Sequence, residues 1–208
     1  MRTQTLATCL NRLSRGMLVI LAAAAITQAR AAEPSGAVLL VATPELGGGY
    51  GHTILIAQPV GDGSHVGLIL NRPTQVGLAD LFPEHAPSRK VAEPVFLGGP
   101  FAVDALFALV RTKESSGEGS LQLAPDLFLA TAATAVDRVI EAAPERARFY
   151  AGLVAWRPGE LAAEIERGFW VVAPFDADVA LRKRTEGMWE ELVRRSRGVT
   201  AGLDAGRS

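Results

Sequence analysis

The sequence predicts one compact α/β domain, with a mixed sheet and helices packed on its faces. Apolar runs of strand length, rich in Val, Ile and Leu and bounded by Gly, Pro and Asp, dominate residues 36–111. After residue 131, helical periods alternate with further apolar runs. A chain that begins with hairpins and ends with strand–helix alternation favours a mixed sheet over a purely parallel one.

The first half of the chain is expected to form strands joined by tight turns. Residues 36–43 (GAVLLVAT) are a near-continuous apolar run that Pro44 ends. The runs at 53–58 and 65–70 are separated by PVGDGS, whose Pro, Gly and Asp are typical of a hairpin loop. The remaining elements of this half are strands at 94–97 and 105–111 and a polar, flexible loop at 113–120.

The second half is expected to contain the helices. Residues 131–143 have a helical period, and Thr131 or Thr134 is the expected N-cap. A second helix at 157–168 is expected to hold Pro158 in its first turn. The other expected elements are two short strands within 121–131 kinked at Pro125, strands at 148–156 and 169–174, and a closing helix at 185–196 with an apolar stripe of Met188, Trp189, Leu192 and Val193.

The first 31 residues have the features of a secretory signal peptide. Basic residues precede an apolar run at 17–26, and Ala29 and Ala31 stand at the −3 and −1 positions of a cleavage site. The apolar run is too short for a membrane span, which needs about 20 residues. We therefore expect a mature domain at 32–198, a disordered tail at 199–208, and a periplasmic or secreted protein with no membrane anchor after cleavage.

The net charge and the cysteine content of the chain exclude some classes of partner and of catalytic chemistry. Removal of the predicted signal peptide takes away four of the 21 Lys and Arg residues, so the mature chain has 17 basic and 22 acidic residues and a net charge of −5. Proteins that neutralise phosphates normally carry a basic surplus, so nucleic acid is not an expected partner. The single Cys, Cys9, lies in the signal segment, which leaves the mature chain without a disulfide or a thiol nucleophile.

The glycine run in PELGGGYGHTI, residues 44–54, raises the question of a phosphate-binding loop. A Walker loop needs G-x-x-x-x-G-K-[ST], and a dinucleotide loop needs G-x-G-x-x-G opening into a helix. Ile54 stands where the third glycine would fall, and a β-branched strand follows instead of a helix. We therefore interpret the run as a structural connector.

No catalytic residue, metal ligand or cofactor site is predicted. In the expected hairpin register, His52 pairs near Asn71 and His65 near Gln58, so the two histidines lie roughly 20 Å apart at the usual rise per residue. Ser64 precedes His65, but neighbouring strand residues point to opposite faces, which argues against a Ser–His pair. Asp176 is interpreted as the N-cap of a short helix.

Three sequence blocks together resemble the YqgE/AlgH family. They are LNRP at 70–73, LGGP at 97–100 and the long block GLVAWRPGELAAEIERGFWVVAP at 152–174, and their order and spacing match over roughly 37–195. The resemblance implies a compact α/β domain of unsettled molecular activity, in a family often described as transcriptional regulators. One departure is the stretch PELGGGYG, where the family typically has Pro-x-Leu-x-Asp-Pro-x-Phe; here Tyr50 takes the aromatic position.

These observations favour a non-catalytic, exported binding or interaction domain. The alternative is a transcriptional regulator acting in the cytoplasm, which requires the signal-peptide prediction to fail. A third hypothesis is an enzyme that uses carboxylates. The expected partner is a small anionic ligand or a protein.

The expected ligand site lies where two strands end. Asn71 and Arg72 end one strand, and Gly98 and Gly99 end another. Ligands of α/β sheets tend to bind beyond strand ends, glycines allow backbone N–H groups to approach an anion, and Arg72 can supply a planar fork. The alternative is a pair of tight turns, in which Asn71 bonds its own backbone and the glycines adopt positive φ.

Overall fold

The computed structural model describes the backbone of residues 32–205 and the side chains of residues 32–196. The predicted signal peptide, residues 1–31, and residues 206–208 lie outside the described part of the chain. Within residues 32–205, no helix is both long and apolar enough to cross a membrane.

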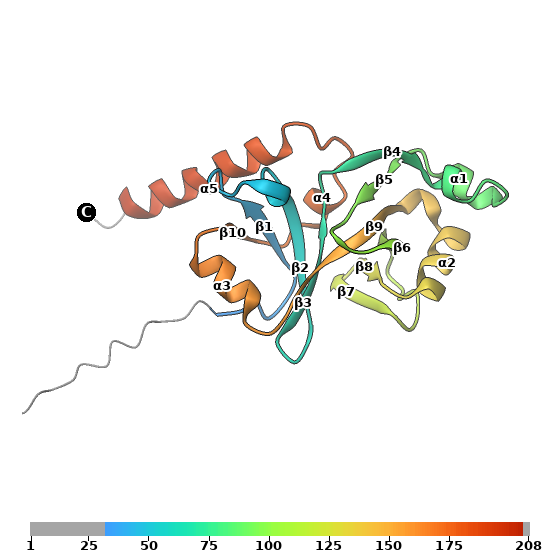
Figure 1. Cartoon of the computed structure of the whole chain (residues 1–208), viewed down its shortest axis with the longest axis horizontal. Coiled ribbons are helices and arrows are strands. Elements are labelled where there is room, and N and C mark those ends of the chain that lie inside the picture. The colour runs from blue at the N-terminus through green and yellow to red at the C-terminus, as the bar shows by residue number, and fades with distance from the viewer. Residues whose placement is uncertain (1–31, 206–208) are drawn as a thin grey trace, which may run out of the picture.

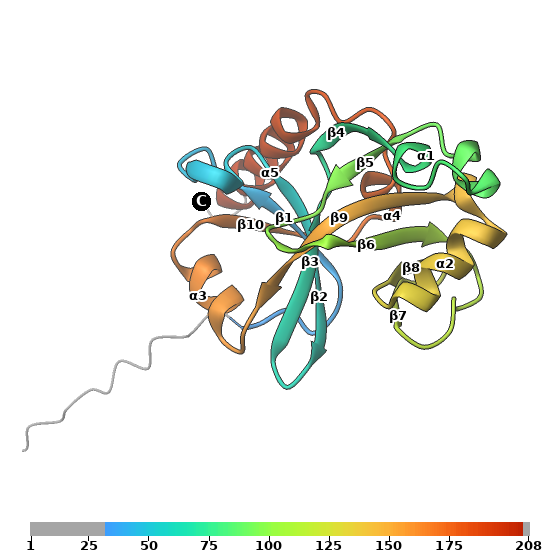
Figure 2. The same ribbon diagram turned by 45° about the vertical axis from the view of Figure 1, so that its right-hand side comes forward.

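Ten strands form a curled sheet that is antiparallel except at one pair (Figures 1 and 2). They are β1 (Val38–Ala42), β2 (Ile54–Gly61), β3 (Ser64–Ile69), β4 (Pro73–Gly77), β5 (Pro94–Leu97), β6 (Phe101–Arg111), β7 (Ser120–Ala124), β8 (Leu127–Ala130), β9 (Ala147–Trp156) and β10 (Trp170–Pro174). The main path runs β10–β1–β2–β3–β9–β6–β8–β7, and β5 pairs with β4 and, in parallel, with β9. The prediction of one domain with a mixed sheet is thus confirmed.

Within residues 32–205, five helices pack against this sheet. They are α1 (Leu78–Leu81), α2 (Ala133–Ala142), α3 (Glu160–Glu166), α4 (Ala177–Ala180) and α5 (Met188–Ala205), with short 3-10 turns η1 (Gly48–Tyr50), η2 (Ala86–Lys90) and η3 (Pro144–Arg146). Figure 2 shows α2 beside β6 and β8, and α5 and α3 at the opposite end of the molecule near β1 and β10.

Each of the three longer helices closes one part of the hydrophobic core. The predicted stripe of α5 is confirmed, because Met188, Leu192 and Val193 are buried in the largest cluster together with residues of β1, β2, β3 and β6. The apolar side of α2 packs on β6 and β8, and Leu161 of α3 packs among residues of β1, β2 and β9. The amphipathic period of the closing helix therefore predicted its buried side correctly.

The hairpin of β2 and β3 forms nearly as its turn sequence predicts. Gln58 pairs with Val66 and Pro59 with His65, one residue from the expected register, and Asp62 and Gly63 turn the chain with positive φ. At the turn Gly61 pairs with Ser64, and a β-bulge between Pro59 and Gly61 shifts the register by one residue between this pair and the rest of the hairpin.

Several boundaries differ from the expectations. The N-cap of α2 is Ala132 without a side-chain cap, because the Thr131 hydroxyl donates instead to the Gly119 carbonyl at 2.9 Å. Pro158 precedes α3, whose N-cap is Gly159 at φ 83°, a conformation that favours glycine.

The ends of two predicted segments also differ. The predicted disordered tail at 199–208 is described only in part, since the backbone of α5 continues through Ala205 and residues 206–208 lie outside the described part of the chain. The predicted strand at 105–111 begins earlier, at Phe101, and β4, α1 and η2 were not predicted. Their sequence from 73 to 93 mixes polar and apolar residues without a clear period, and β4 is held by β5 rather than by its own pattern.

Candidate functional site

The two predicted strand ends lie side by side. The backbone N–H of Ile69 donates to the carbonyl of Gly98 at 2.8 Å, and that of Leu97 donates to the carbonyl of Arg72 at 2.8 Å. The segment that follows β3 is therefore joined to the segment that follows β5. All four predicted site residues belong to this one junction.

The side chain of Asn71 joins the end of β3 to the start of β2 by two hydrogen bonds. Its Oδ1 accepts from the backbone N–H of Ile54 at 3.0 Å, and its Nδ2 donates to the carbonyl of His52 at 2.9 Å. The expectation that Asn71 bonds its own backbone is therefore wrong; it bonds the preceding strand because β2 and β3 pair up to this point. Both polar atoms of the amide are occupied, so Asn71 positions the junction.

Gly98 and Gly99 are required by close backbone packing. A Cβ on Gly98 would lie 2.2 Å from the carbonyl oxygen of Gly152, and one on Gly99 would lie 2.2 Å from backbone atoms of Leu153. Neither glycine has positive φ, so the tight-turn interpretation is wrong in this respect. The N–H of Gly98 donates to the carbonyl of Ala151 at 2.9 Å and is not free to bind an anion.

Arg72 lines a cavity of about 410 Å³ with Gly99. Among the described residues, the guanidinium has one polar contact, from Nη2 to the Gly51 carbonyl at 3.4 Å. Among residues 32–196, no carboxylate lies within ion-pair distance of Arg72. It is the only charged side chain among the lining residues, which are Gly49, Tyr50, Ile69, Arg72, Leu97, Gly99, Pro100 and Val103.

The glycine run forms one wall of this cavity. It folds into the 3-10 turn η1, with Gly48 at φ 65°, and leads into β2. The run therefore connects β1 to β2 through this short turn, and the element that follows it is a strand rather than the α-helix that a phosphate-binding loop opens into. The turn nevertheless brings Gly49 and Tyr50 into the lining beside Arg72.

Tyr50 separates the Arg72 cavity from a larger depression of about 680 Å³. At this depression, Glu164 Oε2 accepts hydrogen bonds from Nε1 of Trp156 at 2.9 Å and Nε1 of Trp170 at 2.7 Å. The Tyr50 ring meets Trp170 edge-on, with centroids 6.0 Å apart. Other residues that line the depression are Phe101, Pro158, Gly159, Glu160 and Arg167.

Opposite charges act on the Tyr50 hydroxyl from the two sides. Burial raises the pKa of Tyr50 above its usual value, and the negative charge of Glu164 raises it further, while the positive charge of Arg72 lowers it. Tyr50 is therefore a neutral hydrogen-bonding group between an anionic and a cationic residue.

Glu164, Trp156 and Trp170 were not predicted as site residues. One signal was present, because a carboxylate recurs on the apolar side of the helix period at 160–166, next to Leu161 and Ile165. A charged residue on such a side needs a polar partner, and buried indoles are common donors. The two indoles belong to different strands, Trp156 to β9 and Trp170 to β10. The sequence does not show that these strands bring both indoles to the same carboxylate.

The histidines occupy separate surroundings. His65 Nε2 lies 3.1 Å from the Pro34 carbonyl, and His52 stacks against Trp189 with ring centroids 4.1 Å apart. His85 lies between Ser88 and Glu141, at 2.8 and 2.6 Å. Within the described residues, no group of three or more His, Cys, Asp or Glu side chains is arranged to hold a metal ion.

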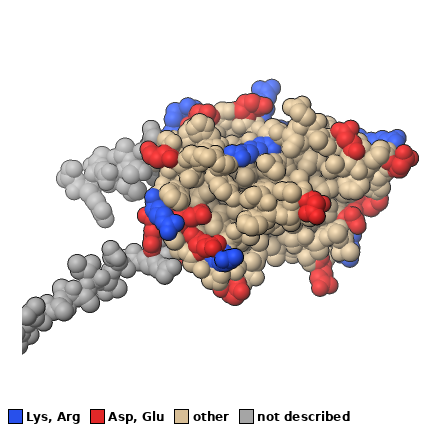
Figure 3. Space-filling model, viewed as in Figure 1, with Lys and Arg blue, Asp and Glu red and all other residues tan. Residues whose placement is uncertain are grey.

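Charged side chains are dispersed over the visible face of the molecule. Figure 3 shows Lys and Arg interspersed with Asp and Glu around a broad uncharged area, without one continuous basic surface. Several basic residues are also neutralised locally, such as Arg182 by Glu191 at 2.6 Å. This face does not have the basic surface typical of a nucleic-acid-binding domain.

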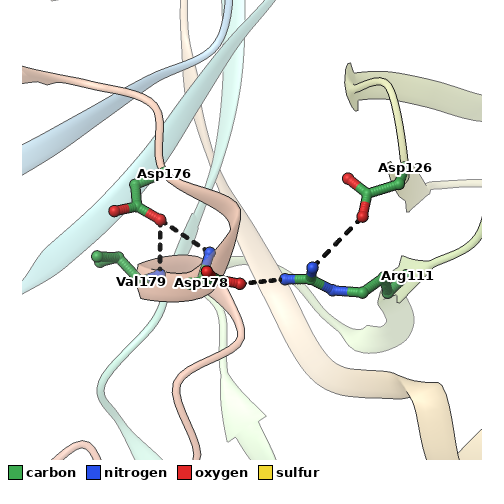
Figure 4. Close-up of polar contacts among 5 residues, drawn as sticks. All are labelled: Arg111, Asp126, Asp176, Asp178 and Val179. Carbon is green, nitrogen blue, oxygen red and sulfur yellow. Dashed lines mark hydrogen bonds and ion pairs between the residues drawn. The ribbon is translucent and has the colours of Figure 1, made fainter.

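Asp176 and Asp178 support the fold around α4. Asp176 accepts from the backbone N–H groups of Asp178 and Val179, which confirms it as the N-cap (Figure 4). Asp178 pairs with Arg111 at 2.7 Å, and Arg111 also contacts Asp126 at 3.3 Å. These contacts attach α4 to β6 and to the turn between β7 and β8.

A family model described as AlgH-like matches residues 39–201. The chain belongs to the AlgH-like family. A UPF0301 protein of Thermobifida fusca is 30% identical over 173 residues, which cover 78% of this chain and 87% of the relative. A UPF0301 protein of Chlorobium phaeobacteroides is 29% identical over 167 residues, which cover 79% and 87%.

Two solved structures have the same fold as this AlgH-like chain. The solution structure of the AlgH protein from Pseudomonas aeruginosa aligns with a TM-score of 0.64 and 22% identity, over 85% of this chain and 97% of that one. The crystal structure of DIP2367 from Corynebacterium diphtheriae aligns with a TM-score of 0.63 and 23% identity, over 79% and 88%. At this level of identity the likeness extends to the fold, and the ligand must be argued from the site.

Proposed function

We propose that this AlgH-like protein is a non-catalytic binding domain that acts after export and takes a small anion with an apolar body. The single observation that carries this proposal is Arg72, a half-buried guanidinium in an apolar cavity with no carboxylate partner among the described residues. A carboxylate or phosphate would supply the missing counter-charge through paired N–H···O bonds.

The cavity lining favours a ligand whose anionic end is attached to hydrocarbon. Ile69, Leu97 and Val103 line the cavity together with Arg72, and Leu97 and Val103 are 37% and 56% exposed. A ligand that covered them would gain about 25 cal/mol for each Å² of apolar surface removed from water. A fully hydrated inorganic ion would leave this surface exposed. A short alkanoate is therefore a suitable first probe.

The binding test compares the purified protein with two Arg variants. Hexanoate should raise the melting temperature of the wild type, and the stabilisation should approach about 2.7 kcal/mol at a hundred times the dissociation constant. Without ligand, the free energy of unfolding of Arg72→Gln should lie within about 0.5 kcal/mol of the wild type, because the guanidinium makes only one long contact, to the Gly51 carbonyl at 3.4 Å, among the described residues. The variant should lose the response to hexanoate. Arg184→Gln is the matched control, since Arg184 is exposed and distant in sequence from the cavity lining.

Two results would overturn the binding proposal. One is the absence of any rise in wild-type melting temperature across alkanoates of four to ten carbons. The other is an equal response in Arg72→Gln and the wild type. In either case Arg72 would be a structural residue of the strand junction.

Export is tested separately from ligand binding. The Ala29/Ala31 pair and the apolar run before it predict a mature protein that starts at or near Ala32. N-terminal sequencing of the native protein from a periplasmic fraction should find that start. An intact Met1 in the cytosolic fraction would overturn the export proposal.

A further inference from the structure

We propose that the depression around Glu164 is a second subsite, which binds a protonated amine, so that the ligand carries an ammonium group in addition to the anionic end held by Arg72. The anionic half of this proposal rests on the proposed function; the amine subsite stands on its own contacts. The ligand class is an amino acid-like molecule with separated charges and an apolar spacer.

The Glu164 carboxylate is held in a fixed orientation. Its Oε2 accepts from two indole N–H groups, and the donors are immobile because Trp156 is 4% and Trp170 is 6% exposed. Its Oε1 accepts no hydrogen bond from the described residues, and Glu164 is a half-buried residue that lines the depression. A pre-oriented acceptor loses little entropy when a ligand donates to it.

The surroundings of Glu164 favour a cation. The charged lining residues are Glu160, Glu164 and Arg167, which give a net charge of −1. Glu160 uses Oε2 to accept from the backbone N–H of Arg157 at 2.8 Å, which leaves its Oε1 for a ligand. Tyr50 also lines the depression, and its hydroxyl oxygen can accept a hydrogen bond. A primary ammonium has three N–H donors and matches this set of oxygen acceptors.

One ligand can extend over both subsites because they share a wall and an apolar edge. Tyr50 lines the Arg72 cavity and the Glu164 depression alike. Phe101 lines the depression and Val103 lines the cavity, and these two residues of β6 are 53% and 56% exposed. An apolar spacer lying along them would bury hydrocarbon that the free protein exposes to water.

The experiment measures binding of three kinds of probe to the purified protein by titration calorimetry. The probes are alkanoates, alkylamines and ω-aminoalkanoates of four to ten carbons. One length of ω-aminoalkanoate should bind about tenfold more tightly than the alkanoate of equal length, a gain of about 1.4 kcal/mol. Glu164→Gln should abolish this gain and leave alkanoate binding unchanged, since a Gln oxygen still accepts from the indoles.

Two further variants keep the test independent of folding effects. Tyr50→Phe should reduce the amine-dependent gain by removing one acceptor. Glu186→Gln is the matched control, because Glu186 is exposed and lies outside the depression lining, and it should bind all probes as the wild type does.

The two proposals fail in different ways. If no length of ω-aminoalkanoate binds better than its alkanoate, or if the gain survives in Glu164→Gln, the amine subsite is excluded. Alkanoate binding that Arg72→Gln removes would then still support the proposed function. If alkanoates fail to bind but alkylamines bind in a Glu164-dependent manner, the amine subsite stands and the Arg72 proposal falls.

Discussion

Replacing Gly98 by alanine should destabilise the domain strongly, although Gly98 lies in a strand end with an ordinary φ. The added Cβ would lie 2.2 Å from the Gly152 carbonyl oxygen, 2.9 Å from Leu68 Cδ2 and 3.1 Å from Tyr150 Cβ. Ordinary contact begins at 3.4 Å, so the backbones would have to separate by 1.2 Å. The nearest obstacle is backbone and cannot rotate away.

The loss of stability in Gly98→Ala can be estimated from the hydrogen bonds that this separation would weaken. Gly98 donates to the Ala151 carbonyl at 2.9 Å and accepts from Ile69 at 2.8 Å, so a shift away from β9 weakens at least one of these bonds. A buried hydrogen-bonding group left without its partner costs about 1–3 kcal/mol. Overpacking of a well-packed core adds about 1–3 kcal/mol. We expect a loss of about 3–5 kcal/mol in the free energy of unfolding.

Urea unfolding followed by circular dichroism measures this loss. For a domain of this size, the melting temperature should fall by about 2–4 °C per kcal/mol. Gly47→Ala is the matched control, because a Cβ on Gly47 meets nothing within 4 Å and its φ is −92°. The control should lie within about 0.5 kcal/mol of the wild type. Equal stabilities for the two variants would refute the packing argument at the junction of β5 and β9.

The remaining predictions concern charge, pH, capping and partners. Glu93→Ala should cost about 3 kcal/mol in urea unfolding, because it removes the carboxylate 2.8 Å from Nε of the buried Arg148; a loss no larger than that of Glu93→Gln would contradict this. Burial raises the pKa of Tyr150 to about 12, above the unfolded value of about 10, so its contribution to stability is present below pH ~10 and is lost as the pH rises toward 12. The stability difference between wild type and Tyr150→Phe should therefore be constant below pH ~10 and change above it, and a difference that never changes with pH would exclude this role. Asp176→Ala should cost about 1 kcal/mol by removing the α4 cap, and Asp176→Asn should restore most of it; equal losses would argue against capping. Gel retardation at micromolar protein should detect no salt-dependent binding of arbitrary duplex DNA. Non-specific DNA binders usually have dissociation constants of roughly 10⁻⁴ to 10⁻⁶ M, so a retarded band under these conditions would contradict the prediction.

Local sequence determined most elements of the fold. The apolar runs of β1, β2, β3, β9 and β10 were evident because a buried strand needs little beyond β-branched residues and flanking turn formers. The stripe on α5 was evident because a helix repeats its side chains every 3.6 residues. The N-cap at Asp176 was evident because capping depends on residues only two and three positions away.

Pairings between distant segments determined the rest. Thr131 was wrongly predicted as an N-cap because its hydroxyl donates to the carbonyl of Gly119, which lies in a neighbouring loop. The strand β4 was missed because its support comes from β5, about 20 residues along the chain. The sequence also marked Gly98 and Gly99 as special, but whether they open toward a ligand or fit against β9 depends on a parallel pairing that no local pattern encodes.

The sequence by itself determined an α/β domain of the AlgH type and singled out Arg72 as the charged residue at a strand end. Only the tertiary structure decided that Arg72, Tyr50 and Glu164 line two adjoining hollows. These residues are separated by up to 114 positions and reside on the β3–β4 junction, η1 and α3. They meet because strand pairing and burial of the helix faces minimise exposed apolar surface over the whole chain, a condition that no short segment can satisfy alone.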